Sequence, residues 1–303
     1  MHIFDTTIGS GDASHSFLIA SCGYERRSSY VCRLGISGAM MIALEYGDVG
    51  GSHTENKETF EQSGWQVLTE NSWPHAFESL SRACANGERV LVDLSSMPRA
   101  VLAKIVETIA TAGGGPEVTF VYAPGDFEQS FAAATRAEVL AAEPMSSYFA
   151  GELRPTSVPI GLVVGLGLEA HRALGVMELL EPAQTWIFST YSADSRFRAA
   201  AESVHRRLLD AFDPSSVFEY DIRSIADTYA ALESLVFSAG LRYRLILAPS
   251  GPKVFTLVCL LVAAERNAAR PAVWRVGDAR PPRALDVREA GDLVAGRVVF
   301  RPS

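Results

Sequence analysis

Residues 18–25 read LIASCGYE, an apolar run that ends in a Gly-x-Glu turn, and residues 162–169 repeat this pattern as LVVGLGLE. A second pattern recurs in the same order. Residues 90–99, VLVDLSSMPR, and residues 245–253, LILAPSGPK, are apolar runs that lead into a loop with serine, proline and a cation. Landmarks that recur in order at about half the chain length indicate an internal duplication.

The spacing of these landmarks supports the duplication. Glu25 and Glu169 are 144 positions apart (169 minus 25), and at that offset residues 41–44 fall on residues 185–188 without a gap. Further along the chain, the offset between matched landmarks departs from 144 by several residues. Because few residues are identical, chance matching of ordinary strand–helix units is the alternative explanation.

Apolar runs of strand length alternate with segments of helical spacing, which is typical of parallel sheets covered by helices on both faces. The fold class is therefore α/β, with two tandem Rossmann-like lobes that have mostly parallel sheets and are related by internal duplication. The first lobe is expected at 1–124, and the second at 160–303, with a C-terminal tail ending in a short strand at 298–300. Between them, 125–159 is expected to be a helical crossover, with an Ala-rich helix around 132–142.

The individual elements follow from the same periodicities. The expected strands lie near 17–21, 41–46, 65–69, 89–94 and 118–122 in the first lobe and near 161–165, 185–190, 216–220, 243–248 and 272–276 in the second. The expected helices span 75–85, 100–111, 170–181, 194–211, 225–239 and 254–268.

The composition indicates a compact soluble protein without a basic surface region. Of 303 residues, 48% are apolar and 20% are charged, and the formal net charge is −8. Because no Lys/Arg run is present, duplex DNA is not expected as a partner, whereas a small anionic ligand held by a few cations is compatible. The apolar runs are too short to span a bilayer and the N-terminus has no signal-peptide pattern, so we expect a cytoplasmic protein with no membrane partner.

Cysteine and histidine placement gives no sign of a metal site. The four cysteines form no C-x-x-C pair and the six histidines show no ligand spacing. We therefore expect reduced thiols, no metal and no cofactor. The chain also lacks a Walker-type loop, a G-x-S-x-G turn and an H-E-x-x-H motif.

The two Ser/Pro/cation loops are the strongest candidates for a ligand site. In an open parallel sheet, ligands bind beyond the carboxyl ends of the strands, where the strand order reverses, and both loops follow strands. Serine hydroxyls, helix N-terminal N–H groups and the matched cations Arg99 and Lys253 together suit a phosphate. Gly251 would let the backbone approach a ligand closely, whereas the first lobe has Met97 there, so the lobes are not expected to be equivalent. The alternative is that serine and proline merely begin a helix.

The same reasoning includes the glycines of the Gly-x-Glu turns. The candidate ligand-binding residues are Ser95, Ser96, Arg99, Ser250, Gly251, Lys253, Gly23 and Gly167.

Glu25 and Glu169 are the candidate catalytic residues. Each carboxylate could accept a hydrogen bond from a ribose or a base, or act as a general base if its pKa is raised. Each could equally form a structural ion pair with a neighbouring cation, namely Arg26, Arg27 or Arg172.

The segment from Leu245 to Leu261 is a strand, then Ser-Gly-Pro-Lys, then an apolar helix, and it resembles the ligand loop of CRISPR-associated Rossmann-fold (CARF) sensor domains. In these domains a Thr/Ser-Gly-Gly-Thr-Lys-like turn links the strand to the helix. Residues 94–99, LSSMPR, resemble a degenerate copy. Two such units in one chain resemble the fused-pair (SAVED-like) sensor domains of bacterial cyclic-oligonucleotide defence systems. The likeness covers most of the chain as architecture but only about six residues per lobe as motif.

Two features depart from the family pattern. Pro252 stands where the family turn has its second glycine, and the Gly-x-Glu turns at Glu25 and Glu169 have no counterpart in it.

The resemblance implies binding of a nucleotide, a cyclic or linear oligonucleotide, in a cleft between two CARF-like lobes. By the resemblance, contacts with its phosphates or ribose would come from Ser250, Gly251 and Lys253 and, through the repeat, from Ser96 and Arg99. Because the two expected lobes account for the chain and leave no room for a separate effector domain, we expect a sensor or accessory subunit of antiviral defence that acts through a partner protein. A homodimer is compatible with this role. Two alternatives stay open: a metal-independent phosphodiesterase or other nucleotide-processing enzyme, with Glu25 or Glu169 as the base, and an interaction subunit that binds no small molecule.

Overall fold

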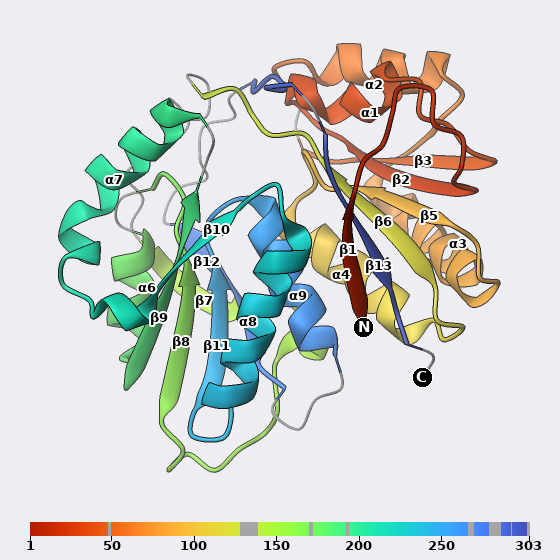
Figure 1. Cartoon of the computed structure of the whole chain (residues 1–303). Helices are drawn as coiled ribbons and strands as arrows, with labels where there is room; N and C mark the ends of the chain where they lie inside the picture. The colour runs from red at the N-terminus through yellow and green to blue at the C-terminus, as the bar shows by residue number, and fades with distance from the viewer. Residues whose placement is uncertain are drawn as a thin grey trace. The chain divides into compact units, whose positions relative to one another are not determined.

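The computed structural model describes residues 1–47, 50–127, 139–169, 172–191, 194–265, 270–278, 286–291 and 293–301. The chain divides into two compact units (Figure 1). The first unit comprises Met1–Ser130 and Arg283–Ser303, and the second comprises Phe131–Pro282. Each unit is built on its own mostly parallel sheet, so the predicted α/β fold with two Rossmann-like lobes is confirmed.

The first unit contains a seven-stranded sheet. In spatial order its strands are β1 (His2–Thr6), β13 (Val294–Val299), β6 (Glu117–Tyr122), β5 (Val90–Asp93), β2 (Phe17–Cys22), β3 (Met40–Glu45) and β4 (Gln66–Leu68). The strands from β6 to β4 are parallel, and β13 runs antiparallel to both β6 and β1. Every residue of the central strand β2 is buried, which explains why it is an uninterrupted apolar run in the sequence.

Helices cover both faces of the first-unit sheet. They are α1 (Tyr30–Arg33), α2 (His53–Gln62), α3 (Trp73–Ala85) and α4 (Arg99–Thr111), with short 3-10 helices at Arg26–Ser29 and Glu70–Ser72. Val31 of α1 and Phe60 of α2 pack with Leu18 and Ala20 of β2 in one core. Figure 1 shows α3 and α4 on the opposite face.

The second unit contains a six-stranded sheet. In spatial order its strands are β10 (Val217–Asp221), β9 (Gln184–Tyr191), β8 (Ile160–Gly165), β11 (Arg244–Pro249), β12 (Ala272–Asp278) and β7 (Val139–Pro144). The strands from β10 to β12 are parallel, and β7 runs antiparallel to β12.

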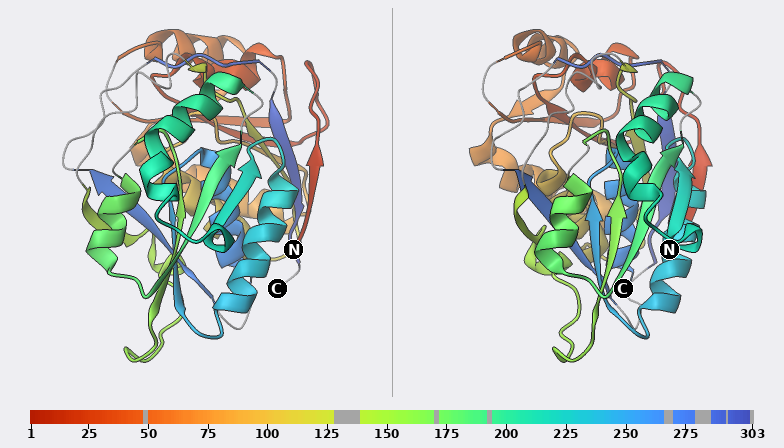
Figure 2. Two further views of the ribbon diagram at one scale, coloured as in Figure 1. Left: turned by 60° about the vertical axis from the view of Figure 1, so that its left-hand side comes forward. Right: turned by 90° about the vertical axis from the view of Figure 1, so that its left-hand side faces the viewer.

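The helices of the second unit follow the same plan as those of the first (Figures 1 and 2). They are α6 (Arg172–Leu180), α7 (Ser195–Leu209), α8 (Ile225–Ala239) and α9 (Lys253–Ala264), with short 3-10 helices at Ser147–Phe149 and Pro214–Ser216. Val176 of α6 and Leu208 of α7 pack on Leu162 and Val164 of β8 in one core, and α8 and α9 lie on the other face. No helix within the described ranges has the length and apolar character needed to cross a bilayer.

The two sheets have the same topology. Going outward, β2 is followed by β3 and β4 on one side and by β5 and β6 on the other, and β8 is followed by β9 and β10 on one side and by β11 and β12 on the other. An antiparallel strand then borders the last parallel strand in each unit, β13 beside β6 and β7 beside β12. The repeat read from the sequence therefore extends to strand order and direction.

The assignment of the C-terminal tail to the second lobe is wrong. The strand β13 lies between β1 and β6 in the first-unit sheet, and it begins at Val294, four residues before the expected start at 298. Conversely β7, which follows β6 in the chain, pairs with β12 of the second unit. Each unit thus takes its antiparallel strand from the segment after the other unit's last parallel strand. Since any strand edge has unpaired backbone groups, sequence order alone does not say which edge a later strand joins.

The expected crossover at 125–159 is corrected as well. Residues 139–144 form β7 instead of the end of an Ala-rich helix, and residues 132–138 lie outside the described chain. Alanine runs favour helix intrinsically, but pairing with the open edge of β12 overrides that weak preference at 139–142.

Candidate functional site

The strand order of each unit reverses at one point. The strand β2 lies between β3 and β5, and β8 lies between β9 and β11, so the loops after β2 and β5, and after β8 and β11, flank the two reversal points. These are the loops chosen from the sequence. Within the first unit they bring together Gly23, Glu25, Ser95, Ser96 and Arg99, and within the second they bring together Gly167, Glu169, Ser250, Gly251 and Lys253.

The two cations begin matched helices. Arg99 is the first residue of α4 and Lys253 is the first residue of α9. The N-cap is Pro98 (φ −59°, ψ 140°) in one unit and Pro252 (φ −54°, ψ 150°) in the other. In the described chain, no side chain caps either helix by a hydrogen bond. The prolines thus begin both helices, as the structural alternative for these loops expected, whereas the serines do not cap them.

In the first unit the loop serines bond within the protein. The backbone N–H and the Oγ of Ser95 both donate to Asp93 Oδ1, and Ser95 Oγ accepts from the backbone N–H of Ala123 at 2.8 Å. Ser96 Oγ lies 2.8 Å from the hydroxyl of Tyr46. Both serines are buried. Both hydroxyls are thus engaged in hydrogen bonds within the first unit in this conformation.

Gly23 is packed under the same tyrosine. A Cβ atom at this position would collide with the Tyr46 hydroxyl, so a larger residue here would require the Tyr46 ring to move. Its backbone is fully bonded, because its N–H donates to Ser28 Oγ at 2.9 Å and its carbonyl accepts from Asn56 Nδ2 at 2.9 Å. Burial raises the pKa of Tyr46, which keeps the phenol protonated as a donor.

Both candidate bases are ion-paired. The Glu25 carboxylate accepts hydrogen bonds from Nε and Nη2 of Arg27, each at 3.2 Å. Glu169 forms an ion pair with Arg172 Nη1 at 3.5 Å. Arg27 is buried and also donates to the carbonyl of Ala123 at 3.1 Å. Burial opposes its charge, but the neighbouring Glu25 raises the pKa of Arg27 above its usual value. The structural ion pair, one of the two alternatives from the sequence, is thus present in both units.

The returning tail lies against the first-unit loops. Asp286 accepts from the backbone N–H of Arg26 at 2.7 Å and from Ser52 Oγ at 2.6 Å. Val287 accepts from the N–H of Arg27 at 3.2 Å, and Glu289 pairs with Arg33 at 3.0 Å. This segment further encloses the carboxyl end of the first-unit sheet.

In the second unit, two glycine turns touch through their backbones. A Cβ on Gly251 would collide with the carbonyl oxygen of Leu166, and a Cβ on Gly167 would lie 2.9 Å from the carbonyl oxygen of Ser250. The absence of both side chains allows the loops after β8 and β11 to approach. Thr190 Oγ1, at the end of β9, reaches the Leu166 carbonyl at 3.3 Å and lies 3.2 Å from the Tyr220 hydroxyl.

The second unit also contains buried polar atoms that lack partners. Ser250 is 5% exposed, and its buried Oγ has no hydrogen bond with any residue that the structure describes. His205 of α7 is buried, and its Nε2 lies 2.7 Å from the carbonyl oxygen of Gly167. Its Nδ1 has no partner among the described residues. A buried polar group without a partner costs about 1–3 kcal/mol, so such groups at one edge of a sheet call for an explanation.

The two edges therefore differ chemically. In the first unit the loop side chains bond to one another, to Tyr46 and to Ala123. In the second unit Ser250 Oγ is buried without a described partner, beside two glycine turns that approach each other closely. Sequence reasoning selected both Ser/Pro/cation loops but missed Tyr46 and His205. The position of Tyr46 directly after β3 could have suggested a place at the same sheet edge, whereas no local pattern distinguishes His205 within its helix.

Potential metal ligands are scattered in the described parts of the chain. Among those residues, no three His, Cys, Asp or Glu side chains are grouped so as to hold a metal ion. All four cysteines are buried free thiols, and burial raises the pKa of Cys22 to about 12.

The chain was also compared with known proteins. No model of a protein family matches it, and no curated protein matches its sequence.

Proposed function

We propose that the protein binds a nucleotide through the second-unit edge formed by Gly167, Ser250, Gly251 and Lys253. The ligand class is a cyclic or linear oligonucleotide, and the role is that of a sensor or accessory protein that acts through a partner. The ligand class, the partner and the setting in bacterial defence come from the resemblance to CARF and SAVED sensor domains.

One observation carries the proposal. The Oγ of Ser250 is buried without a described partner, at a point where strand order reverses and just before α9. A hydroxyl donor, a glycine turn and a lysine at a helix N-terminus are the groups that bind phosphate oxygens. A phosphate at this edge would receive the Ser250 hydrogen bond, which relieves the cost of leaving that hydroxyl unpaired.

Binding without turnover is favoured over the phosphodiesterase alternative. A general base must accept a proton, and Glu25 and Glu169 are each held by an arginine that stabilises the charged carboxylate. Both carboxylates are thereby engaged in ion pairs within their own units. An oligonucleotide that is retained unchanged is therefore the expected outcome.

The test is to incubate the purified protein with cyclic and linear oligonucleotides, and to identify by mass spectrometry what is retained and what is converted. Retention of an intact compound by the wild type, lost in Ser250→Ala and in Lys253→Ala, supports the proposal. Lys104→Ala is the matched control, because Lys104 is an exposed lysine within α4 of the first unit that pairs with Glu107. Conversion to shorter products would establish the enzyme alternative. If no compound is retained and none is converted, the result would favour the interaction subunit.

A further inference from the structure

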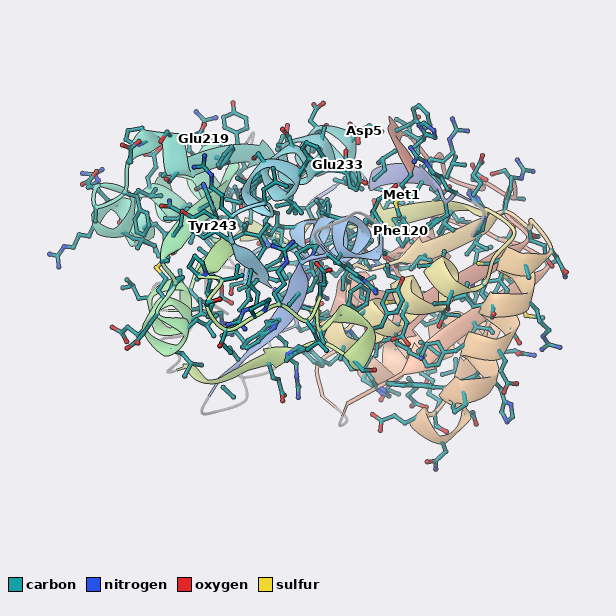
Figure 3. The ribbon with its side chains drawn as sticks, turned by 90° about the horizontal axis from the view of Figure 1, so that it is seen from below. Met1, Asp5, Phe120, Glu219, Glu233 and Tyr243 are labelled. Carbon is teal, nitrogen blue, oxygen red and sulfur yellow. The ribbon has the colours of Figure 1, made fainter. Side chains whose placement is uncertain are left out.

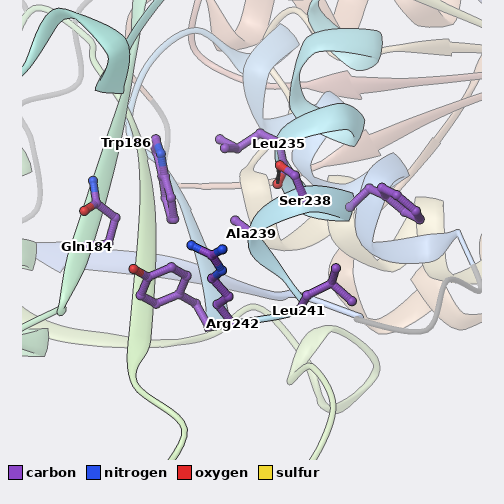
Figure 4. Close-up of a pocket in the computed structure, with 9 residues that line it drawn as sticks. Gln184, Trp186, Leu235, Ser238, Ala239, Leu241 and Arg242 are labelled. Atoms are coloured by element: carbon purple, nitrogen blue, oxygen red, sulfur yellow. Dashed lines mark hydrogen bonds between the residues drawn. The ribbon is translucent and has the colours of Figure 1, made fainter.

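A hollow lies at the end of the second-unit sheet opposite to the proposed nucleotide site (Figure 4). Its volume is about 570 Å³, and it is bounded by the start of β9, the end of α8 and the turn into β11. Tyr243, which precedes β11, is labelled at this end of the unit in Figure 3. Strands of six residues at about 3.3 Å per residue put this hollow roughly 20 Å from the carboxyl edge. It is therefore distinct from the proposed nucleotide site.

One wall of the hollow is aromatic. The rings of Trp186 and Tyr243 meet edge to face, with centroids 5.5 Å apart and an interplanar angle of 82°. Gly161 of β8 makes room for them, because a Cβ there would lie 2.8 Å from Tyr243 Cβ and 3.0 Å from the Trp186 ring. Phe237 and Leu241 line the hollow as well and are 72% and 78% exposed. Exposed apolar side chains around a concave aromatic surface are typical of a binding site.

Among the residues that the structure describes, Arg242 is the only charged one that lines the hollow. Figure 4 shows its side chain rising from the turn, with the guanidinium between Trp186 and Ala239. This side chain forms no hydrogen bond or ion pair with any residue that the structure describes. The hollow thus combines one uncompensated cation with aromatic and aliphatic walls.

The usual structural role of such an arginine is already filled. A cation near the end of a helix commonly binds the last carbonyl groups. At the end of α8, Arg154 performs this role, because its Nη1 donates to the carbonyl of Gly240 at 2.6 Å. Stabilisation of the helix end therefore does not account for the position of Arg242.

We propose that this hollow binds a small organic anion with a flat aromatic body, such as an aromatic carboxylate. The guanidinium of Arg242 forms a charge-assisted hydrogen bond with the carboxylate, and Trp186 and Tyr243 contact the ring. The volume lies within the range of about 300–1,000 Å³ that is usual for small-molecule sites. The proposal is independent of the nucleotide site at the other end of the sheet.

The probe is 1-naphthoate, with neutral 1-naphthamide as its partner of equal shape. We expect saturable binding of 1-naphthoate to the full-length protein at about millimolar concentration, as for other ligands of this size. In NMR titrations the indole N–H signal of Trp186 should shift with the same binding curve. The amide should bind at least about tenfold more weakly, because it lacks the charge that pairs with Arg242.

Variants test the assignment of the site. Arg242→Gln, which keeps hydrogen-bond donors but removes the charge, and Trp186→Leu, which keeps the site apolar, should each weaken 1-naphthoate binding about tenfold or more. Arg207→Ala, which removes an exposed arginine of α7, should leave the affinity unchanged. The proposal is overturned if 1-naphthoate does not bind, if the amide binds equally well, or if Arg242→Gln retains the wild-type affinity.

Discussion

The Nε2 atom of His205 lies 2.7 Å from the carbonyl oxygen of Gly167, which ties α7 to the glycine turn after β8. Because a carbonyl oxygen only accepts, the proton is on Nε2, and the buried Nδ1 is an acceptor without a partner in the described part of the chain. Burial lowers the pKa of His205, against the opposing effects of the Gly167 hydrogen bond and of Glu169. The neutral imidazole is therefore part of the folded second-unit edge.

This bond predicts a specific pH dependence. Since the folded pKa of His205 lies below its unfolded value of about 6.5, the unfolded chain binds more protons as the pH falls below that value. The free energy of unfolding should therefore fall with pH from about 6.5 down to the folded pKa, by at most about 1.4 kcal/mol per pH unit. In His205→Gln, whose amide can still donate to Gly167, this part of the loss should disappear.

Denaturant unfolding from about pH 7.5 to 5.5 checks the prediction, across the range in which histidine titrates. The control is His75→Gln, since His75 is 80% exposed in its side chain. Equal pH dependence in the wild type and in His205→Gln would show that His205 does not titrate in this way.

Matched serine substitutions should have opposite consequences in the two units. Ser95→Ala removes the partner of Asp93 and of the Ala123 N–H, so it should lower the free energy of unfolding by about 1–3 kcal/mol. Ser250→Ala removes a buried hydroxyl that has no described partner, so the free energy of unfolding of the ligand-free protein should stay the same or rise, by up to about 1–3 kcal/mol. Chemical denaturation of both variants without ligand decides the matter. A large loss in Ser250→Ala would mean that the hydroxyl has a structural role.

Gly251→Ala should destabilise the second unit. Its new methyl group would collide with the Leu166 carbonyl, and overpacking of this kind costs about 1–3 kcal/mol. Gly277→Ala in β12 is the matched control, because a Cβ there would meet Ala141 at an ordinary 3.6 Å. The comparison uses melting temperatures together with hydrogen exchange in the turns after β8 and β11. Equal stability of the two variants would refute the close approach of these turns.

The Glu25–Arg27 pair should behave as a unit. Removing one member of a buried ion pair leaves an uncompensated charge, so Arg27→Met should lower the free energy of unfolding by about 3–5 kcal/mol. The double variant Glu25→Gln with Arg27→Met should lower it by less, because neither charge is left alone. A double-mutant cycle measured by denaturant unfolding gives the coupling. Additive losses in the cycle would mean that the two residues do not depend on each other.

Local patterns predicted the parallel strands well, since their apolar runs follow directly from burial, as in β2 and β8. The matched starts of α4 and α9 were also visible, because Pro-Arg and Pro-Lys mark the first helical positions. The location of β13 was not predictable in this way. Its partners β1 and β6 are distant in sequence, and nothing local chooses between two open sheet edges.

Prediction of the site has the same limit. The sequence identified loops that the topology places at the strand-order reversals, but it treated Ser96 and Ser250 as equivalent. Their difference depends on Tyr46, which is 50 residues from Ser96 and reaches it only after β3 and β5 have joined β2. Hydrogen-bond partners that are distant in sequence decide whether a loop serine is structural or available to a ligand.

The most direct test of the central claim is calorimetric titration of an oligonucleotide retained by the wild type into Ser250→Ala, Lys253→Ala and Lys104→Ala. We predict that Ser250→Ala and Lys253→Ala each weaken binding about tenfold or more, since each removes a hydrogen bond or a charge from the phosphate. Lys104→Ala should bind as the wild type does. Wild-type affinity in both second-unit variants would contradict the account.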